Sequence, residues 1–262
     1  MNTSYIVLGI VVLLFLILFS VKYVVADKYT LREMLNAKDE EKIAEAELPK
    51  MDGIAQNFTY SIWLYVNNWN YKNGEYKPIF GKFGDGATID QEYFNGMDNC
   101  NILDSDVLSE EFNTVCNKKP SPVVTFDKYQ NNIIIYMPCD ESITGNTNIH
   151  KCMVQNIPIQ KWVNLSITLY KKTLDIYING KLHKTCVLPG IPDLQQGDIH
   201  LTPAGGFDGY TSKFQFYPEA LNPQEIWNIY SNGYGSLAST LGDYQVKMSL
   251  IENGNETNSL TI

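Results

Sequence analysis

The chain has 262 residues, of which 44% are hydrophobic, 12% aromatic and 19% charged. Enough apolar surface is available for one sizeable core, which excludes a disordered chain. The formal net charge of -9 argues against nucleic-acid binding, because such binding requires clustered Lys and Arg to displace counterions from phosphates.

The first element is an uncharged run, YIVLGIVVLLFLILFSV at residues 5–21, whose apolar character continues past Lys22 to Ala26. As a helix, 17 to 22 residues span about 26 to 33 Å, which matches the hydrocarbon core of a bilayer. We therefore predict a transmembrane anchor over residues 1–26. A cleaved signal peptide is the alternative, although MNTS has no basic residue and the apolar run is long for a signal core.

The flanking charges predict an orientation for this anchor. Lys22, Lys28 and Arg32 follow the span, and no basic side chain precedes it. The positive-inside rule then places the C-terminal part on the cytosolic side of the membrane.

Residues 27–50 are expected to form a helical stalk. TLRE at residues 30–33 is a capping-box pattern, in which Thr30 and Glu33 bond each other's backbone amides. Strong helix formers continue from there until Pro49. The stalk would be about 30 Å long.

From residue 51 to residue 262 we expect an all-β, antiparallel two-sheet jelly-roll sandwich with one short helix. Short runs rich in β-branched and aromatic residues alternate with Gly, Pro, Asn and Asp. LDIYINGKL at residues 174–182 is a hairpin with Asn179-Gly180 at a type I′ turn. PEALNPQEIWNIY at residues 218–230 is the helix, with Asn222 as its cap and Pro223 at its first position. YQVKMSLI and TNSLTI are expected as closing strands.

The order of these segments resembles the concanavalin A-like lectin/glucanase superfamily, in particular laminin G-like jelly rolls. The resemblance covers residues 53–235 and rests on an early-strand Trp, a second Trp, the Tyr-x-Asn-Gly hairpin, a Phe-x-Gly strand and a final Ala-Leu-x-x-x-Glu-Ile helix. The membrane-anchored form, with WLYVNNWNYKNGEYKPIFGK, also looks like virion proteins of large nucleocytoplasmic DNA viruses.

Glucanases of this superfamily carry paired carboxylates on a Glu-x-Asp-x-x-Glu or Glu-x-Asp-x-Glu strand, and neither pattern occurs here. The three histidines, His150, His183 and His200, are scattered without a partner nucleophile. The sequence therefore predicts a protein that is not an enzyme and needs no cofactor.

Three groups of residues remain as candidate sites. Calcium, which many domains of the resembled family bind, would find oxygen donors in Asp98, Asn101, Asp104 and Asp106. A carbohydrate site requires an aromatic platform with planar amides, for which Tyr71, Tyr76, Tyr93 and Asn95 are available. Two short-loop disulfides are possible, Cys100 with Cys116 and Cys139 with Cys152, and they would suit an oxidising environment.

These features predict a membrane-anchored structural or docking protein whose jelly roll binds neighbouring virion or membrane proteins and ties an internal membrane to a capsid. The alternative is a lectin-like receptor that binds glycans. Lipid is a partner in both readings, and nucleic acid in neither.

Overall fold

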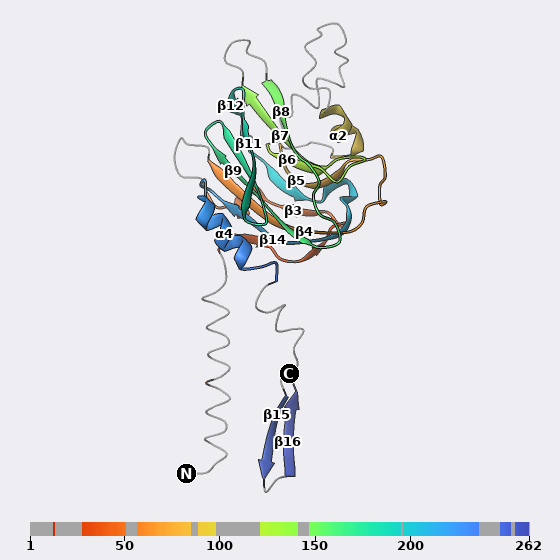
Figure 1. Cartoon of the computed structure of the whole chain (residues 1–262), viewed down its shortest axis with the longest axis vertical. Helices are drawn as coiled ribbons and strands as arrows, with labels where there is room; N and C mark the ends of the chain where they lie inside the picture. Colours follow the sequence, from red (N-terminus) through yellow and green to blue (C-terminus); the bar gives the residue numbers. More distant parts are fainter. Residues whose placement is uncertain are drawn as a thin grey trace. The chain divides into compact units, whose positions relative to one another are not determined.

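The computed structural model describes residue 13 and residues 28–50, 57–84, 89–97, 121–140, 147–194, 196–235, 247–252 and 255–261. The chain divides into two compact units, one of Tyr29–Tyr234 and one of Met1–Lys28 with Gly235–Ile262. Within the first unit, two antiparallel β-sheets pack face to face (Figure 1). The expected all-β sandwich is confirmed.

Each sheet has seven strands, which are named here in spatial order. The first sheet, called sheet A, contains β1 (Thr30–Arg32), β14 (Asp208–Tyr217), β4 (Phe58–Asn68), β9 (Trp162–Tyr170), β10 (Thr173–Ile178) and β11 (Lys181–Val187), with β2 (Leu35–Asn36) also beside β14. The second, sheet B, contains β12 (Ile191–Pro192), β7 (Ile133–Asp140), β6 (Val123–Phe126), β5 (Lys77–Phe83), β13 (Asp198–Leu201) and β3 (Glu41–Ile43), with β8 (Thr147–Val154) also beside β7. The remaining elements are η1 (Glu45–Glu47), α2 (Gln91–Met97), η2 (Pro203–Gly205), α4 (Pro223–Ser231), β15 (Lys247–Glu252) and β16 (Asn255–Thr261).

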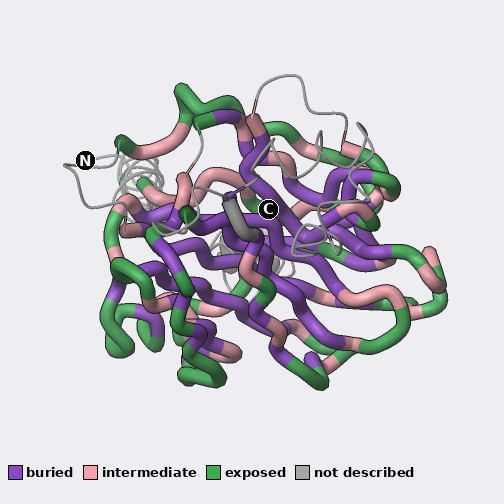
Figure 2. Tube along the Cα trace, turned by 90° about the horizontal axis from the view of Figure 1, so that it is seen from above, coloured by how far each residue is buried: buried purple, intermediate pink, exposed green. Residues whose placement is uncertain are grey.

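The core lies between the sheets because alternate residues of each strand point inward. In β4, Tyr60, Ile62 and Leu64 are almost fully buried in it. Ile133 and Ile135 of β7 belong to the same cluster, from sheet B. Figure 2 shows the buried residues running through the centre of the sandwich. This two-layer packing fixes which face each strand presents to solvent.

The predicted stalk over residues 27–50 is wrong, because this segment contributes strands to both sheets. β1 and β2 pair with β14 in sheet A, and β3 pairs with β13 in sheet B. Ala37 and Ile43 are completely buried, so this burial outweighs the helix propensity of the segment. The sandwich thus starts near residue 30 and not at residue 51.

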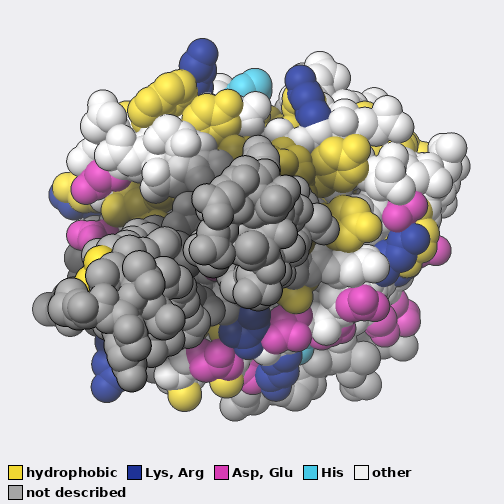
Figure 3. Space-filling view, turned by 90° about the horizontal axis from the view of Figure 1, so that it is seen from below, with side chains coloured by type: hydrophobic (Ala, Val, Ile, Leu, Met, Phe, Trp, Pro, Cys, Tyr) yellow, Lys and Arg dark blue, Asp and Glu magenta, His cyan; other side chains and the backbone are white. Residues whose placement is uncertain are grey.

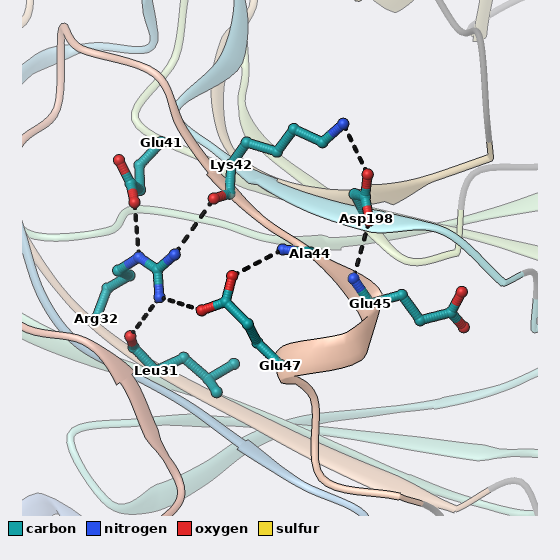
Figure 4. A network of polar contacts seen from close by, with 8 residues as sticks. All are labelled: Leu31, Arg32, Glu41, Lys42, Ala44, Glu45, Glu47 and Asp198. Atoms are coloured by element: carbon teal, nitrogen blue, oxygen red, sulfur yellow. Dashed lines mark hydrogen bonds and ion pairs between the residues drawn. The ribbon is translucent and has the colours of Figure 1, made fainter.

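Arg32 lies at the centre of the polar contacts that hold this N-terminal segment (Figure 4). Its guanidinium donates to Glu41 at 2.7 Å and Glu47 at 3.0 Å, and to the carbonyls of Leu31 and Lys42. The neighbouring Asp198 accepts from the Glu45 amide at 2.8 Å and pairs with Lys42 at 2.7 Å. These contacts connect β1 of sheet A with β3 and β13 of sheet B.

The other side of the sandwich is joined by a disulfide between Cys152 of β8 and Cys186 of β11. The predicted Cys139–Cys152 pairing is wrong. Cys139 lies opposite Asn148 and Cys152 opposite Ile135 in the β7–β8 register, four residues apart. That offset is about 13 Å along the strands, whereas disulfide Cα atoms lie within about 7 Å. The other predicted pair, Cys100 and Cys116, lies outside the described residues.

The predicted hairpin and helix are both confirmed. Asn179 and Gly180 form the two-residue turn between β10 and β11, with φ of 51° and 72°. Asn222 caps α4 by accepting hydrogen bonds from the amides of Gln224 and Glu225. The helix packs on the outer face of sheet A through a cluster of Tyr177, Tyr217, Leu221 and Ile226.

Two expectations about the chain ends have different outcomes. β15 and β16 pair with each other, but they form a separate two-stranded sheet and do not close the sandwich. The predicted anchor over residues 1–26 lies outside the described residues, apart from Leu13. Among the residues that the structure describes, no helix combines the length and apolarity needed to cross a bilayer.

Candidate ligand-binding surface

The structure separates the four residues predicted to form a carbohydrate platform. Tyr76 and Tyr93 are buried together on the outer face of sheet B, in the cluster that α2 covers. The Tyr76 carbonyl accepts from the side-chain amide of Gln91 at 2.7 Å, and burial raises the pKa of Tyr93. Asn95 is exposed on α2, and Tyr71 lies on the connection between β4 and β5. Buried rings cannot stack on a sugar, so Tyr76 and Tyr93 cannot belong to the predicted carbohydrate platform.

Tyr71 is half-buried and fixed by its surroundings. Its hydroxyl donates to the Gly205 carbonyl at 3.1 Å. The Lys38 ammonium lies 4.9 Å from the centre of its ring and pairs with Asp208 at 3.1 Å. Lys72 donates to the neighbouring Ala204 carbonyl. The β4–β5 connection is therefore attached to η2 and to the start of β14.

The β4–β5 connection also contacts an exposed aromatic residue of another loop, which the sequence analysis missed. Tyr129, between β6 and β7, has 70% of its surface exposed. Its carbonyl accepts from the Trp69 indole at 3.4 Å. Its ring lies against Gly74, where a Cβ added to the glycine would be 3.6 Å from the nearest ring atom. Gly74 in turn donates its amide to the Lys128 carbonyl at 3.3 Å. The β4–β5 and β6–β7 connections, which are distant in sequence, thus hold the Tyr129 ring in an exposed position.

Lysines accompany the rings of this region. The Lys77 ammonium lies 4.6 Å from the Trp69 ring centre, and that of Lys128 lies 4.6 Å from Tyr76. Lys77 donates to the Lys128 carbonyl at 3.3 Å, and burial lowers its pKa. Lys77 therefore supports the loops, whereas Lys128 lies next to the exposed Tyr129. We call Trp69, Tyr71, Lys72, Lys128 and Tyr129 the loop-end surface.

Strand β4 separates the loop-end surface from α4. At its start, the Thr59 hydroxyl accepts from the Leu221 amide just before α4, at 3.0 Å. Nearer the middle of the strand, Trp63 stacks on Tyr230 of α4 with ring centres 5.6 Å apart, and Trp69 follows Trp63 by six positions, just after the end of β4. At the rise of an extended strand, six positions are about 20 Å. Figure 1 shows α4 and the β4–β5 connection on different sides of the sandwich.

A small pocket at the joint of β8 and β11 is a weaker candidate. Its volume is about 280 Å³, and it is lined by Met153, Val154, Gln155, His183 and Lys184. Lys184 crosses it to donate to the Met153 carbonyl at 2.8 Å. Ligand pockets usually measure about 300 to 1,000 Å³ and have apolar walls. This pocket is smaller, and it lies beside the Cys152–Cys186 disulfide, which makes it part of the joint between the sheets.

The predicted calcium ligands, Asp98, Asn101, Asp104 and Asp106, lie outside the described residues and stay a prediction. Within the described part of the chain, no three His, Cys, Asp or Glu side chains are grouped to hold a metal ion. The histidines remain apart: His200 contacts Glu40 at 2.6 Å, and His150 has its pKa lowered by burial and by Lys184.

No protein-family model matches this sequence, and no curated protein matches it. Solved structures do resemble it. The receptor binding domain of botulinum neurotoxin D has a TM-score of 0.50 at 11% identity, over 79% of this chain and 45% of the toxin domain. That of the C/D mosaic serotype has a TM-score of 0.50 at 12% identity, over 79% and 44%. The ligand binding domain of serotype D in complex with N-acetylneuraminic acid scores 0.48 at 12% identity, over 77% and 42%.

This likeness concerns the fold. The chain spans less than half the length of each of these toxin domains, at identities near one in eight. The shared architecture is the two-sheet sandwich, and these neighbours are named as binding domains. The narrower resemblance to laminin G-like domains and to virion proteins stays a prediction.

Proposed function

We propose that this protein is a non-enzymatic, membrane-tethered recognition domain that binds a glycan at its loop-end surface. The exposed ring of Tyr129 carries this proposal. Aromatic side chains supply rigid contact area at low conformational cost, and they dominate recognition sites that lack deep pockets. The sandwich supports such a site because functional loops on a rigid scaffold are the common arrangement in binding domains. Support for a binding role comes from the fold, since the receptor binding domains of the toxins named above share a two-sheet sandwich with this chain over less than half of their length.

The chemistry around Tyr129 suits a polar ligand with one flat face. Gln130 and Asn73 are exposed on the two loops that meet there, and they offer planar amides. Lys128 and Lys72 add positive charge locally, although the chain as a whole carries -9. A saccharide bearing a carboxylate or sulfate group would use the ring, the amides and the lysines together.

The tether is the apolar segment at residues 5–26, and the disulfide bears on which side the domain faces. A bond such as Cys152–Cys186 forms and persists in oxidising compartments. The proposed domain therefore faces an oxidising compartment, in contrast to the cytosolic side predicted from Lys22, Lys28 and Arg32. The expected link to a viral capsid stays a prediction.

Binding of the full-length chain in detergent micelles to a glycan array tests the proposal. We expect a set of acidic glycans to bind, and Tyr129→Ala to weaken that binding at least about tenfold, or 1.4 kcal/mol. Tyr170→Ala is the matched control, because Tyr170 is also exposed and also adjoins a lysine in the sequence, Lys171, whose ammonium lies 5.3 Å from the Tyr170 ring centre.

Tyr170 lies at the end of β9, outside the loop-end surface. Its removal should leave binding unchanged. The proposal fails if no glycan binds, or if both variants bind as the unmodified chain does.

A further inference from the structure

The distance between the apolar segment and the sandwich is short. The segment ends at Ala26, and β1 begins at Thr30, with only residues 27–29 between them. Even fully extended, three residues span about 10 Å. Whatever holds residues 5–26 therefore lies close to the point where the chain enters the sandwich.

That entry point lies beside α4. The ring of Tyr29 is 4.4 Å from that of Tyr217, and its carbonyl accepts from the Phe216 amide at 3.1 Å. Tyr29 also packs against the cluster that contains Leu221 and Ile226. This cluster is the contact between α4 and sheet A. The entry point is thus fixed to the α4 side of the domain. The nine residues of α4 extend about 14 Å along the same outer face.

Large apolar side chains are exposed on this side of the domain. Trp227 of α4 has 41% of its surface exposed, and Tyr234, just after the helix, has 40%. Leu182 is 54% exposed and lies opposite Tyr177 in the β10–β11 register, which places it next to the cluster under α4. Figure 3, a view from the side where α4 lies in Figure 1, shows hydrophobic side chains at the surface. We call Leu182, Trp227 and Tyr234 the α4 face.

The aromatic residues of the α4 face are of the types that favour a membrane–water interface. Trp and Tyr concentrate at membrane–water interfaces, where the ring is apolar and the N–H or O–H reaches water. Lys181 and Lys213 flank the α4 face: Lys181 follows the turn that contacts Trp227, and Lys213 donates to the carbonyls of Asn232 and Gly233. Basic residues beside apolar ones favour a surface that carries phosphate groups.

We propose that the α4 face rests on the lipid headgroups of the membrane that holds residues 5–26. This inference depends on the tether included in the proposed function, and it adds an orientation. With α4 on the lipid, the loop-end surface, which lies about 20 Å along β4 from the contact of Trp63 with Tyr230, stays free for its ligand. The short connection limits how far the entry point can lie from the lipid, and the Trp and Tyr side chains stabilise the contact.

Fluorescence quenching of the full-length chain in phosphatidylcholine vesicles that contain a headgroup spin-labelled lipid tests the contact. The chain has four tryptophans. We expect the label to quench the emission of the unmodified chain, and Trp227→Phe to lose most of that quenching. Trp69→Phe is the control, because Trp69 lies at the other end of β4 and should retain it.

Alkaline carbonate extraction of the same vesicles tests the membrane tether separately from the lipid contact of the α4 face. If the chain is extracted, the tether is wrong and the orientation is wrong with it. If the chain stays in the membrane but Trp227→Phe is quenched as strongly as the unmodified chain, only the lipid contact of the α4 face is overturned. Glycan binding in detergent needs neither result, so it tests the loop-end surface separately.

Discussion

Gly180 shows how one residue joins two elements of the fold. Its φ of 72° belongs to the left-handed region, which the hairpin turn requires. A Cβ at this position would lie 2.9 Å from the Cβ of Tyr230 and 3.0 Å from the ring of Trp227. The hairpin turn and the packing of α4 on sheet A therefore both depend on the absence of a side chain at Gly180.

We expect Gly180→Ala to lower the free energy of unfolding by about 2 to 4 kcal/mol, from backbone strain plus displacement of α4. Gly233→Ala is the matched control, because Gly233 has a φ of 70° but nothing lies within 4 Å of its added Cβ. It should cost only the strain, about 1 to 2 kcal/mol. Urea unfolding measures both, and equal losses would show that Gly180 does not limit the packing of α4.

At the scale of elements, the N-terminal segment depends on charged contacts for its position. The Arg32 guanidinium, followed by the Ala44 amide, lowers the pKa of Glu47. Lys42, followed by the Glu45 amide, lowers the pKa of Asp198. A carboxylate whose pKa is lower in the folded chain stabilises the fold above its ordinary pKa, and this contribution is lost as the pH falls.

We therefore expect the stability of the domain to decrease as the pH drops below about 4, partly through these two carboxylates. Arg32→Gln should destabilise the domain at pH 7 by about 1 to 2 kcal/mol, because it removes both ion pairs and two bonds to carbonyls. It should also make the acid decrease shallower. Thermal unfolding between pH 3 and 7 measures this, with Arg32→Lys as the variant that keeps the charge. An unchanged pH profile in Arg32→Gln would contradict the assignment.

At the scale of the whole molecule, the folded unit includes the segment that sequence reasoning assigned to a stalk. Removing residues 28–50 takes away three strands and the completely buried Ala37 and Ile43. Loss of one buried Ile side chain alone costs about 2 to 5 kcal/mol, comparable with much of the stability of a domain.

We therefore expect residues 28–235 to be expressed as a compact domain with cooperative thermal unfolding, and residues 51–235 to aggregate or unfold. Gel filtration and circular dichroism distinguish the two outcomes. If the shorter piece unfolds as cooperatively as the longer one, β1 to β3 are accessory to the sandwich and not part of its core structure.

The sequence by itself determined what depends on neighbours along the chain. Strand alternation gave the sandwich, Asn179-Gly180 gave the hairpin turn, and Asn222-Pro223 gave the start of α4, because each is a local conformational preference. The same local reasoning predicted a helix for residues 27–50, because the segment is rich in strong helix formers. Local composition does not show that this segment pairs with the distant strands β13 and β14.

Only the tertiary structure decided which distant residues meet. The β7–β8 register moved Cys152 away from Cys139, and the meeting of sheet edges placed it beside Cys186. The packing of α2 buried Tyr76 and Tyr93, while two loops brought Trp69 under Tyr129. Burial and contact between remote segments depend on the arrangement of both sheets in space, and one-dimensional periodicity contains no information about that arrangement.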